Sequence, residues 1–412
     1  MLLGVLFNSC KDETYTIQTA NVPIYMNVDE WRSLPLEIES ARSIKEAGQI
    51  YIYGELLFVV EPLEGIHIIN NSNPEAPINL AFLPVYATSQ ISIRNDVLFT
   101  NSYFDILSID ISDPMNPSLV SRAENAVSFD AITLLPGYDN NYTMANVNQP
   151  DNVIIGWELD DVKMPLYNHY AICGDVSFAN LESSSGGGEF GPQIGIGGSL
   201  ARFTILNDHL YTLETNSLQS FAISSSGSLS DQGSQDIWRT CETIFPNQNH
   251  LFIGTTSGML IYDIVNPGSP ALKSEVNHIV SCDPVVVQEG RAYVTLSTGI
   301  NCWGTNSLEV MNVEDLTNPS NITQYSLTHP QGLGVDGNLL FVCDDEDGLK
   351  IFDRTDDFTI TDHLILHESS ILSKDVIAHE GVLIVRAQDG IHQWSYADQN
   401  NFHELSVIQT SN

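Results

Sequence analysis

The chain has 412 residues, 42% of them hydrophobic, and it carries 52 acidic against 15 basic side chains, a formal net charge of −37. The hydrophobic content is sufficient for a large core. So negative a chain repels polyanions, which makes nucleic acid and anionic membrane surfaces poor partners. The charge has two interpretations: solubility at a cell surface or in salty water, or affinity for divalent or organic cations.

The N-terminus is similar to the end of a lipoprotein signal peptide. Met1–Ser9 is an apolar run too short to span a bilayer, and Cys10 follows it. A lipid on Cys10 would anchor a soluble domain to a membrane without spanning it. The tripeptide Lys11-Asp12-Glu13 is similar to the acidic tag that directs some Gram-negative lipoproteins to the outer face of the outer membrane. We therefore expect a signal remnant at 1–10 and an outer-membrane protein that faces the exterior; a chance cysteine is the alternative.

Beyond a linker or extension at 11–45, one sequence motif is repeated along the chain. Gly65–Pro77 returns as Asp105–Pro117 and again as Gly258–Pro270. Around the second copy, short β-prone runs alternate with turn residues, which predicts four strands joined by tight turns. One sheet of this size cannot bury both of its faces, so we expect such sheets to stack radially into an all-β propeller of four-stranded blades with strand one innermost.

The spacing of the repeats predicts the number of blades. First strands are expected to start at intervals of roughly 40 residues, which is the spacing of a propeller. The expected starts are near Ile50, Ile91, Ser128, Arg202, Cys241, Cys282, Leu333 and Val376. This count favours eight blades in one domain at 46–412, with an insertion at about 160–199 in the third unit. The third unit is degenerate, so seven blades remain possible.

One pair of cysteines is expected to lie at a shared end of a blade. Cys282 starts the first strand of its unit, and Cys302 falls in the enlarged turn after Val294–Leu296. Strands in a blade alternate in direction, which places both cysteines at the same end. Because disulfides persist outside the cytoplasm, we predict a Cys282–Cys302 bond. Two free buried thiols are the alternative.

Several stretches in order resemble the LVIVD-repeat family, bacterial surface proteins of the β-propeller class. The resemblance covers roughly Ala47 to Asp353. Its most specific stretches are Gly65–Pro77, Gly197–Thr204, Glu242–Phe245, Ser281–Val287 and Gly332–Phe341. The resemblance implies a surface-anchored propeller and no established reaction, so it supplies no catalytic residues.

The candidate site comes from the expected topology. Residues at or just before the start of each first strand should project toward the mouth of the central channel, where polar groups from separate blades converge. These candidate ligand-binding residues are Gln90, Asp130, Arg202, Glu242, Asp283, Gln331 and Asp375. Four of them, Asp130, Glu242, Asp283 and Asp375, offer carboxylates to a hard cation such as Ca²⁺. An ordinary channel rim is the alternative.

Two further motifs are weaker. Asp344–Gly348 is similar to a calcium loop, but Cys343 and Arg354 replace its first and last ligands, so a turn between strands two and three is expected. Gly197–Ala201 departs from the nucleophile elbow at its fifth position. We therefore expect a binding or interaction scaffold for an unidentified protein or glycan at the cell surface. The alternative is an extracellular hydrolase or lyase with its site at the channel mouth.

Overall fold

The computed structural model describes residues 15–129, 132–147, 149, 151–165, 195–277, 284–298, 304–399 and 401–411. The chain divides into two compact units. Unit 1 comprises Met1–Pro35 with Phe129–Phe178, and unit 2 comprises Leu36–Ser128 with Ala179–Asn412.

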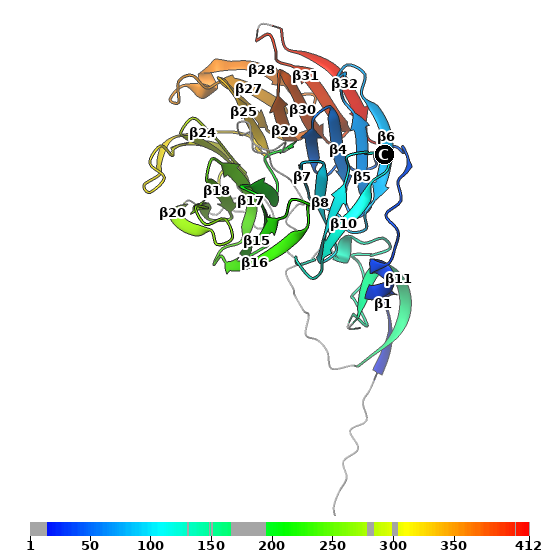
Figure 1. The fold of residues 1–412 in the computed structure, drawn as a ribbon. Coiled ribbons are helices and arrows are strands. Elements are labelled where there is room, and N and C mark those ends of the chain that lie inside the picture. Colours follow the sequence, from blue (N-terminus) through cyan, green and yellow to red (C-terminus); the bar gives the residue numbers. More distant parts are fainter. Residues whose placement is uncertain are drawn as a thin grey trace, which may run out of the picture. The chain divides into compact units, whose positions relative to one another are not determined.

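Unit 2 is a ring of four-stranded antiparallel blades, coloured in chain order in Figure 1. The first blade contains β3 (Ile50–Tyr53), β4 (Leu56–Glu61), β5 (Gly65–Asn70) and β6 (Ile78–Pro84), with β12 (Ile196–Gly197) and β2 (Glu39–Ser40) added at its two edges. The second blade contains β7 (Ile91–Arg94), β8 (Val97–Ser102), β9 (Asp105–Asp110) and β10 (Ser118–Ala123).

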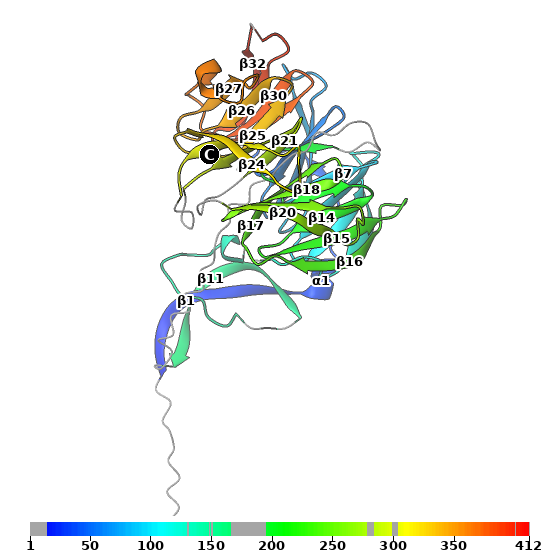
Figure 2. The same cartoon turned by 90° about the vertical axis from the view of Figure 1, so that its left-hand side faces the viewer.

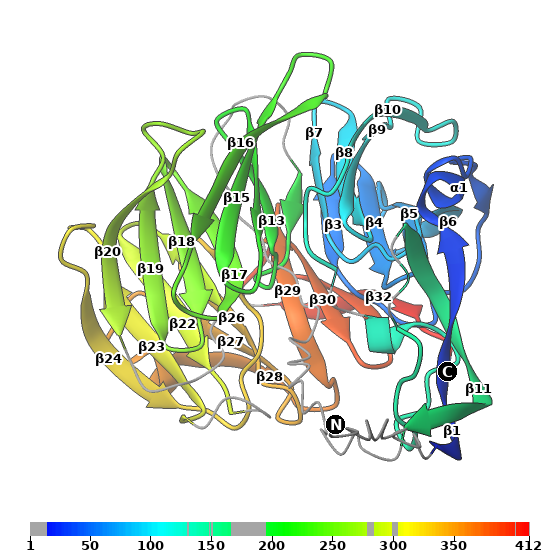
Figure 3. The same ribbon diagram turned by 90° about the horizontal axis from the view of Figure 1, so that it is seen from below.

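The next three blades lie side by side in Figure 3. Their strands are β13 (Phe203–Leu206), β14 (His209–Leu213), β15 (Ser217–Ile223) and β16 (Leu229–Asp236); β17 (Cys241–Asn247), β18 (His250–Thr255), β19 (Gly258–Asp263) and β20 (Ala271–Asn277); and β21 (Val285–Gln288), β22 (Arg291–Leu296), β23 (Ser307–Asn312) and β24 (Ser320–Ser326).

The last two blades bring the ring back to the first. They contain β25 (Leu333–Asp336), β26 (Leu339–Cys343), β27 (Leu349–Asp353) and β28 (Leu364–Glu368), with η2 (Ile360–His363), and then β29 (Ser373–His379), β30 (Val382–Ala387), β31 (Gly390–Ser395) and β32 (His403–Gln409). The first strands contact one another from blade to blade, as in β3 with β7 and β25 with β29. Strand one is therefore innermost, as predicted.

Radial stacking explains which strands are apolar. The second and third strands of a blade have neighbouring blades on both faces, so they are buried almost throughout, as β4 and β5 show. The fourth strand has solvent along its outer edge, and β10 is accordingly exposed or half-buried at every residue. Apolar runs rather than strict alternation follow from burial on both faces.

The repeated sequence motif forms the turn between the third and fourth strands. In the second blade, a carboxylate oxygen of Asp110 accepts a hydrogen bond from the Ser112 N–H at 2.8 Å, and Asp113 accepts one from Met115 at 3.1 Å. The first, fifth and sixth blades contain the same pair of side-chain turns, with Asn70 or Asn312 in place of aspartate in two of them. Short polar side chains recur because they bind their own backbone two residues on.

The described part of unit 2 forms seven blades, the smaller of the two numbers that the sequence left open. The expected unit near Ser128 builds no blade. From Phe129 the chain leaves for unit 1, where it contributes η1 (Ile132–Leu134) and β11 (Asn152–Pro165). The count of eight is therefore corrected to seven, because β11 pairs with the N-terminal segment instead of folding into four short strands.

Unit 1 is built on a two-stranded antiparallel ribbon, shown in Figure 2. Its first strand, β1 (Tyr15–Asn27), pairs with β11 and falls in the region expected to be a linker. The five-residue α1 (Val28–Arg32) follows, and the side chain of Asn27 caps it by accepting a hydrogen bond from Asp29 N–H at 2.9 Å. Among the described residues, no helix is long and apolar enough to cross a membrane.

A short segment after the insertion runs along the inner side of the ring. Its strand β12 pairs with β3, and the Gly195 N–H donates to the Ile93 carbonyl of the second blade at 3.0 Å. Further along, the Ala201 carbonyl accepts from Ile244 of the fourth blade at 2.9 Å. We call residues 195–201 the channel segment, because it touches first strands from several blades at once.

Candidate functional site

The strand registers show how the predicted site residues are arranged. Counting four residues back from the last paired residue of each first strand gives one equivalent position per blade, which we call the ring position. It is occupied by Gln49, Gln90, Arg202, Thr243, Pro284, Gly332 and Asp375. Three of the predicted residues lie at this level. Glu242 and Gln331 each lie one residue earlier and are half-buried.

Three side chains at the ring position bind neighbouring blades together. The amide of Gln49 donates to the Ile91 carbonyl of the second blade at 3.1 Å and accepts from the Ile91 N–H. Gln90 accepts from the Arg202 N–H of the third blade at 2.9 Å. Arg202 in turn donates to the Cys241 carbonyl of the fourth blade at 3.4 Å. These side chains therefore hydrogen-bond successive blades to one another.

Gln49 was not among the residues predicted from the sequence, although a signal for it exists. Gln49 stands directly before Ile50, which starts the first strand of the first blade, as Gln90 stands directly before Ile91, which starts that of the second. Aligning the two would have placed Gln49 at the same level.

The carboxylate of Asp375 is bound by the channel segment. Asp375 is fully buried, and its Oδ1 accepts hydrogen bonds from the Ser199 N–H at 2.9 Å and the Ser199 hydroxyl at 3.2 Å. The same hydroxyl accepts from the Leu333 N–H of the sixth blade at 2.6 Å. Gly198 and Gly332 lie against the carboxylate so closely that a Cβ on either would overlap it. One serine thus joins two blades around a buried charge.

The remaining predicted residues divide into two groups. Glu242 and Gln331 lie near the start of their blades' first strands, where Gln331 is held through its main chain by Thr295 and Cys343 at 2.6 and 2.7 Å. Residues outside the described ranges are Cys10, Asp130, Asp283, Cys282 and Cys302. In the described ranges no group of three or more His, Cys, Asp or Glu side chains is arranged to hold a metal. The four-carboxylate cation site and the disulfide therefore stay predictions.

The acidic run after β26 forms the expected turn between strands two and three. Asp344 is fully buried and accepts from the His329 N–H at 2.6 Å and from the Lys350 ammonium. Asp345 is paired with Lys374 at 2.7 Å, and its Oδ2 lies 3.1 Å from Nδ1 of His329. Asp344 and Asp345 are thus each paired with a lysine of the protein itself.

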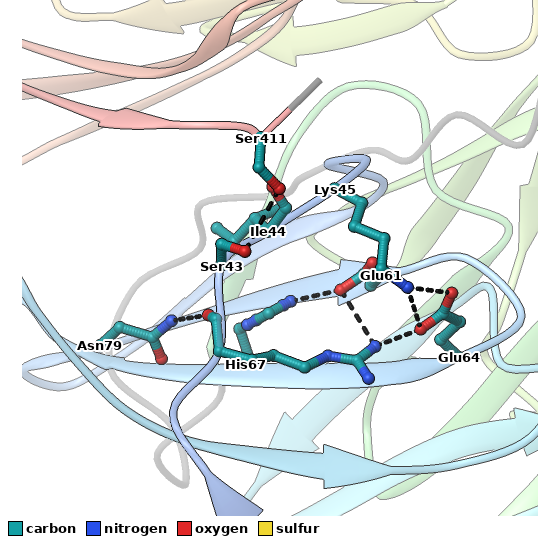
Figure 4. A network of polar contacts seen from close by, with 9 residues as sticks. Ser43, Ile44, Lys45, Glu61, Glu64, His67, Asn79 and Ser411 are labelled. Carbon is teal, nitrogen blue, oxygen red and sulfur yellow. Dashed lines mark hydrogen bonds and ion pairs between the residues drawn. The ribbon is translucent and has the colours of Figure 1, made fainter.

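A second ionic network, drawn in Figure 4, joins the segment before β3 to the first blade. Glu61 is buried and lies 2.7 Å from Nε2 of His67 and 3.2 Å from the guanidinium of Arg42. Glu64 binds both Arg42 and Lys45, the latter at 2.8 Å. Burial lowers the pKa of His67, against the opposing effect of Glu61. The network fixes the segment that precedes β3 onto the first blade.

The same segment also meets the C-terminus. Ser411 N–H donates to the Ile44 carbonyl at 2.7 Å, and Ile44 forms an isolated parallel bridge with Thr410. No sequence signal predicted this contact, because Ile44 and Ser411 are far apart in the chain and meet only once the ring closes.

Two exposed aromatic side chains lie at the end of the ring at which first strands begin. We call this end the loop face, because each connection from a fourth strand to the next first strand lies there. Trp238, between β16 and β17, is 94% exposed, and Tyr86, between β6 and β7, is 54% exposed. Next to Trp238, the guanidinium of Arg239 binds Glu275 at 2.8 Å and Asn277 at 2.6 Å, which fixes the loop.

Comparison with known sequences supports the expected resemblance. The LVIVD repeat matches residues 98–124 and 247–278. Both stretches are similar to the LVIVD repeat. The first stretch runs through strands two to four of the second blade, and the second stretch through strands two to four of the fourth blade. Each includes the turn formed by the repeated sequence motif. A search among curated proteins found none that matches this chain.

Solved structures support the fold. The periplasmic gluconolactonase PpgL of Pseudomonas aeruginosa superposes with a TM-score of 0.56 at 10% identity, over 89% of this chain and 97% of that chain. Sqt1 of Saccharomyces cerevisiae gives a TM-score of 0.52 at 10% identity, over 90% of this chain and 87% of that chain. Identities this low show a shared propeller fold and nothing about activity.

Proposed function

We propose that this protein is a lipid-anchored surface propeller that binds an extracellular glycan or protein at its loop face. The observation that carries the proposal is the exposure of Trp238, an indole that offers 94% of its surface to solvent on a rigid ring. Tryptophan and tyrosine are enriched at interaction sites, where their flat faces stack on sugars or fill a partner's pocket.

The surroundings of Trp238 suit recognition. Its loop is held by the ion pair and hydrogen bond of Arg239, so the indole is presented without a large loss of loop entropy on binding. On the same end of the ring, Tyr86 adds a second exposed ring, and Glu242 and Gln331 are half-buried polar groups. Loops on a rigid scaffold commonly carry binding residues.

Fluorescence tests the proposal directly. Among the described tryptophans, Trp31, Trp157 and Trp394 are buried, so Trp238 dominates quenching by acrylamide in this set. The full chain with Cys10→Ala, which needs no detergent, is titrated with a library of bacterial surface polysaccharides and with solubilised envelope proteins. A bound partner is expected to protect the fluorescence from acrylamide.

Two variants complete this test. Trp238→Phe measures the share of quenching that belongs to Trp238, and Trp238→Ala should weaken binding at least tenfold. Phe358→Ala, which removes a 69% exposed ring from the turn between β27 and β28 at the other end of the blade, should leave binding unchanged. Equal losses in both alanine variants would place the binding surface elsewhere.

The anchor is tested separately. Cells that express the wild-type chain or Cys10→Ala are labelled with a radioactive fatty acid, and label is expected in the wild type alone. Protease added to intact cells should then digest the wild-type protein if it faces the exterior. Equal labelling of both chains would refute lipid attachment, and full protection from protease would refute the outward orientation.

A further inference from the structure

Unit 1 contains a cavity of about 480 Å³ beside β1. The cavity lies between that strand and the segment that precedes β11, and its volume falls in the range of roughly 300–1,000 Å³ that is typical of small-molecule sites. All of the residues that line it belong to unit 1. They are Val22, Pro23, Tyr25, Asn146, Val147 and Gln149.

The two walls of this cavity are fixed to each other on both sides. On one side, the Asn21 N–H donates to the Thr143 carbonyl at 2.8 Å, and the Asn21 carbonyl accepts from the Ala145 N–H at 2.9 Å. On the other side, the Tyr25 hydroxyl donates to the Asn146 carbonyl at 2.7 Å. A site whose walls are fixed in this way needs little further ordering when a ligand binds.

Three polar groups of the lining are available to a ligand. The side-chain amides of Asn146 and Gln149 are exposed and form no hydrogen bond with the described part of the chain. The Pro23 carbonyl points away from β11, because Trp157, which faces Pro23 in the register, donates its N–H outside the ladder at 2.8 Å. Amides both donate and accept hydrogen bonds, and carbonyls accept them. The cavity therefore offers donors and acceptors without charge.

The lining is uncharged although the chain is strongly acidic. None of the six residues has an acidic or basic side chain, whereas the sequence has 52 acidic and 15 basic ones. Burial raises the pKa of Tyr25 above 10.0, so the phenol is neutral at physiological pH. A charged ligand would lose hydration here without gaining an ion pair. The lining therefore favours a neutral ligand that can both donate and accept hydrogen bonds.

The contacts of Asn21 and Tyr25 also limit the shape of a ligand. These residues are four positions apart on β1, which is about 13 Å at roughly 3.3 Å per residue. An extended peptide that continued along β1 would meet the opposite wall at Asn21 or at Tyr25, whereas a compact ring fits between them. The cavity therefore favours a compact neutral molecule over a polypeptide.

We propose that this cavity binds a neutral saccharide. Sugar hydroxyls both donate and accept hydrogen bonds, which matches the two side-chain amides and the Pro23 carbonyl. The apolar C–H face of a sugar ring packs on the aromatic ring of Tyr25, and Val22 and Val147 complete the apolar part of the wall. Trp238 does not line this cavity, so the site does not depend on the function proposed above.

Matched pairs of sugars test the proposal on the full chain with Cys10→Ala. Saturation-transfer difference NMR and calorimetry compare N-acetylglucosamine with glucosamine, glucose with glucuronate, and galactose with galacturonate. We expect at least one neutral sugar to bind, and its charged counterpart to bind about tenfold more weakly, because the lining offers no ion pair. Failure of every neutral sugar to bind would overturn the proposal, and so would equal binding of neutral and charged counterparts.

Removal of the two amides locates the site. The variants are Gln149→Ala and Asn146→Gly; glycine is chosen because Asn146 has a φ of +60°, which glycine adopts freely. Each variant should weaken sugar binding about fivefold, as expected for the loss of one hydrogen bond. Gln18→Ala is the control, because it removes an exposed amide of β1 that does not line the cavity. It should leave binding unchanged, and equal losses in all three variants would overturn the proposal.

Two further comparisons test the ring and the location. Tyr25→Phe and Tyr25→Leu both lose the hydroxyl that binds Asn146, but only phenylalanine keeps an aromatic face, so it should bind sugar more tightly. Equal binding by these two variants would overturn the proposal. Trp238→Ala should leave this binding unchanged. Sugar binding that is lost in Trp238→Ala and kept in Gln149→Ala would overturn the proposal and assign the sugar to the loop face. Binding of a proline-rich peptide without any sugar would also overturn it.

Discussion

At the scale of single residues, the polar side chains around the axis of the ring hydrogen-bond to neighbouring blades and to the channel segment. Gln49, Gln90 and Arg202 join successive blades, and Ser199 binds the buried carboxylate of Asp375. A buried charge is costly unless it is hydrogen-bonded, so the fit of the channel segment around Asp375 should matter for stability.

Gly198→Ala tests that fit. A Cβ at this position would overlap the Asp375 carboxylate, and overpacking of this kind costs about 1–3 kcal/mol. Gly334→Ala is the control, because the nearest atom to its Cβ is a methyl group of Val376 at 3.4 Å, an ordinary contact. Urea unfolding should show a large loss for the first variant and little change for the second. Equal effects would contradict the close packing at Asp375.

His67 gives a prediction that depends on pH. Burial lowers the pKa of His67 below the ordinary value of 6.5, so the folded state binds this proton less readily than the unfolded chain. Its contribution to stability is complete above about pH 6.5 and is lost as the pH falls through the folded pKa. The free energy of unfolding should therefore fall less between pH 7.5 and 5 in His67→Gln than in the wild type.

The control for this prediction is His403→Gln, which replaces an exposed histidine in β32. It should reproduce the pH dependence of the wild type. An unchanged slope in His67→Gln would mean that His67 titrates alike in the folded and unfolded states.

At the scale of elements, the turn between the third and fourth strands is the unit that repeats. Asp110 in the second blade is replaced by Asn70 and Asn312 in two others, and all three accept a hydrogen bond from the N–H two residues on. The oxygen acceptor is common to these turns, and the charge is not.

Replacing Asp110 separates the two contributions. Asp110→Ala removes the acceptor and should cost about 0.5–1.5 kcal/mol at neutral pH, whereas Asp110→Asn should cost little. The hydrogen bonds from Ser112 lower the pKa of Asp110 below 3.8. This stability is present above about pH 3.8 and is lost as the pH falls through the folded pKa. Acid titration monitored by circular dichroism should show that loss in the wild type and not in Asp110→Asn.

Local signals account for what could be predicted from the sequence. The turn around Asp110 and the buried strands beside it depend on residues close in the chain, so the blades and their inner first strands were predictable. The segment after Ser128 has the right spacing for a blade, but its partner β1 lies far away in the sequence. The pairing of Ser199 with Asp375 likewise arises only when separate blades meet.

At the scale of the whole ring, closure depends on contacts between the first and seventh blades. Asn71 and Gln393 form a reciprocal amide pair there, with distances of 2.9 and 2.7 Å, and Gln393 is fully buried. The Ser406 hydroxyl also donates to the Pro74 carbonyl at 2.6 Å. These contacts replace the covalent continuity that joins the other blades.

A double-mutant cycle measures the closing pair. Asn71→Ala and Gln393→Ala should each destabilise the protein, and the double variant should cost less than their sum, with a coupling of about 0.5–3 kcal/mol. The control cycle uses Asn207 and Asn249, an exposed amide pair between the third and fourth blades at 2.9 Å. Its coupling should be smaller. Additive effects at Asn71 and Gln393 would show that closure does not depend on this pair.

The channel segment has a consequence for the order in which the chain can fold. Ser199 precedes five of the seven blades in the sequence, yet its partner Asp375 lies 176 residues later, in the last of them. During synthesis, the blades can form one after another from local contacts, but this serine must wait until the final blade exists. Long-range contacts of this kind slow folding. The centre of the ring is therefore among the last parts to become native, and a chain truncated before the seventh blade would leave Ser199 without its acceptor.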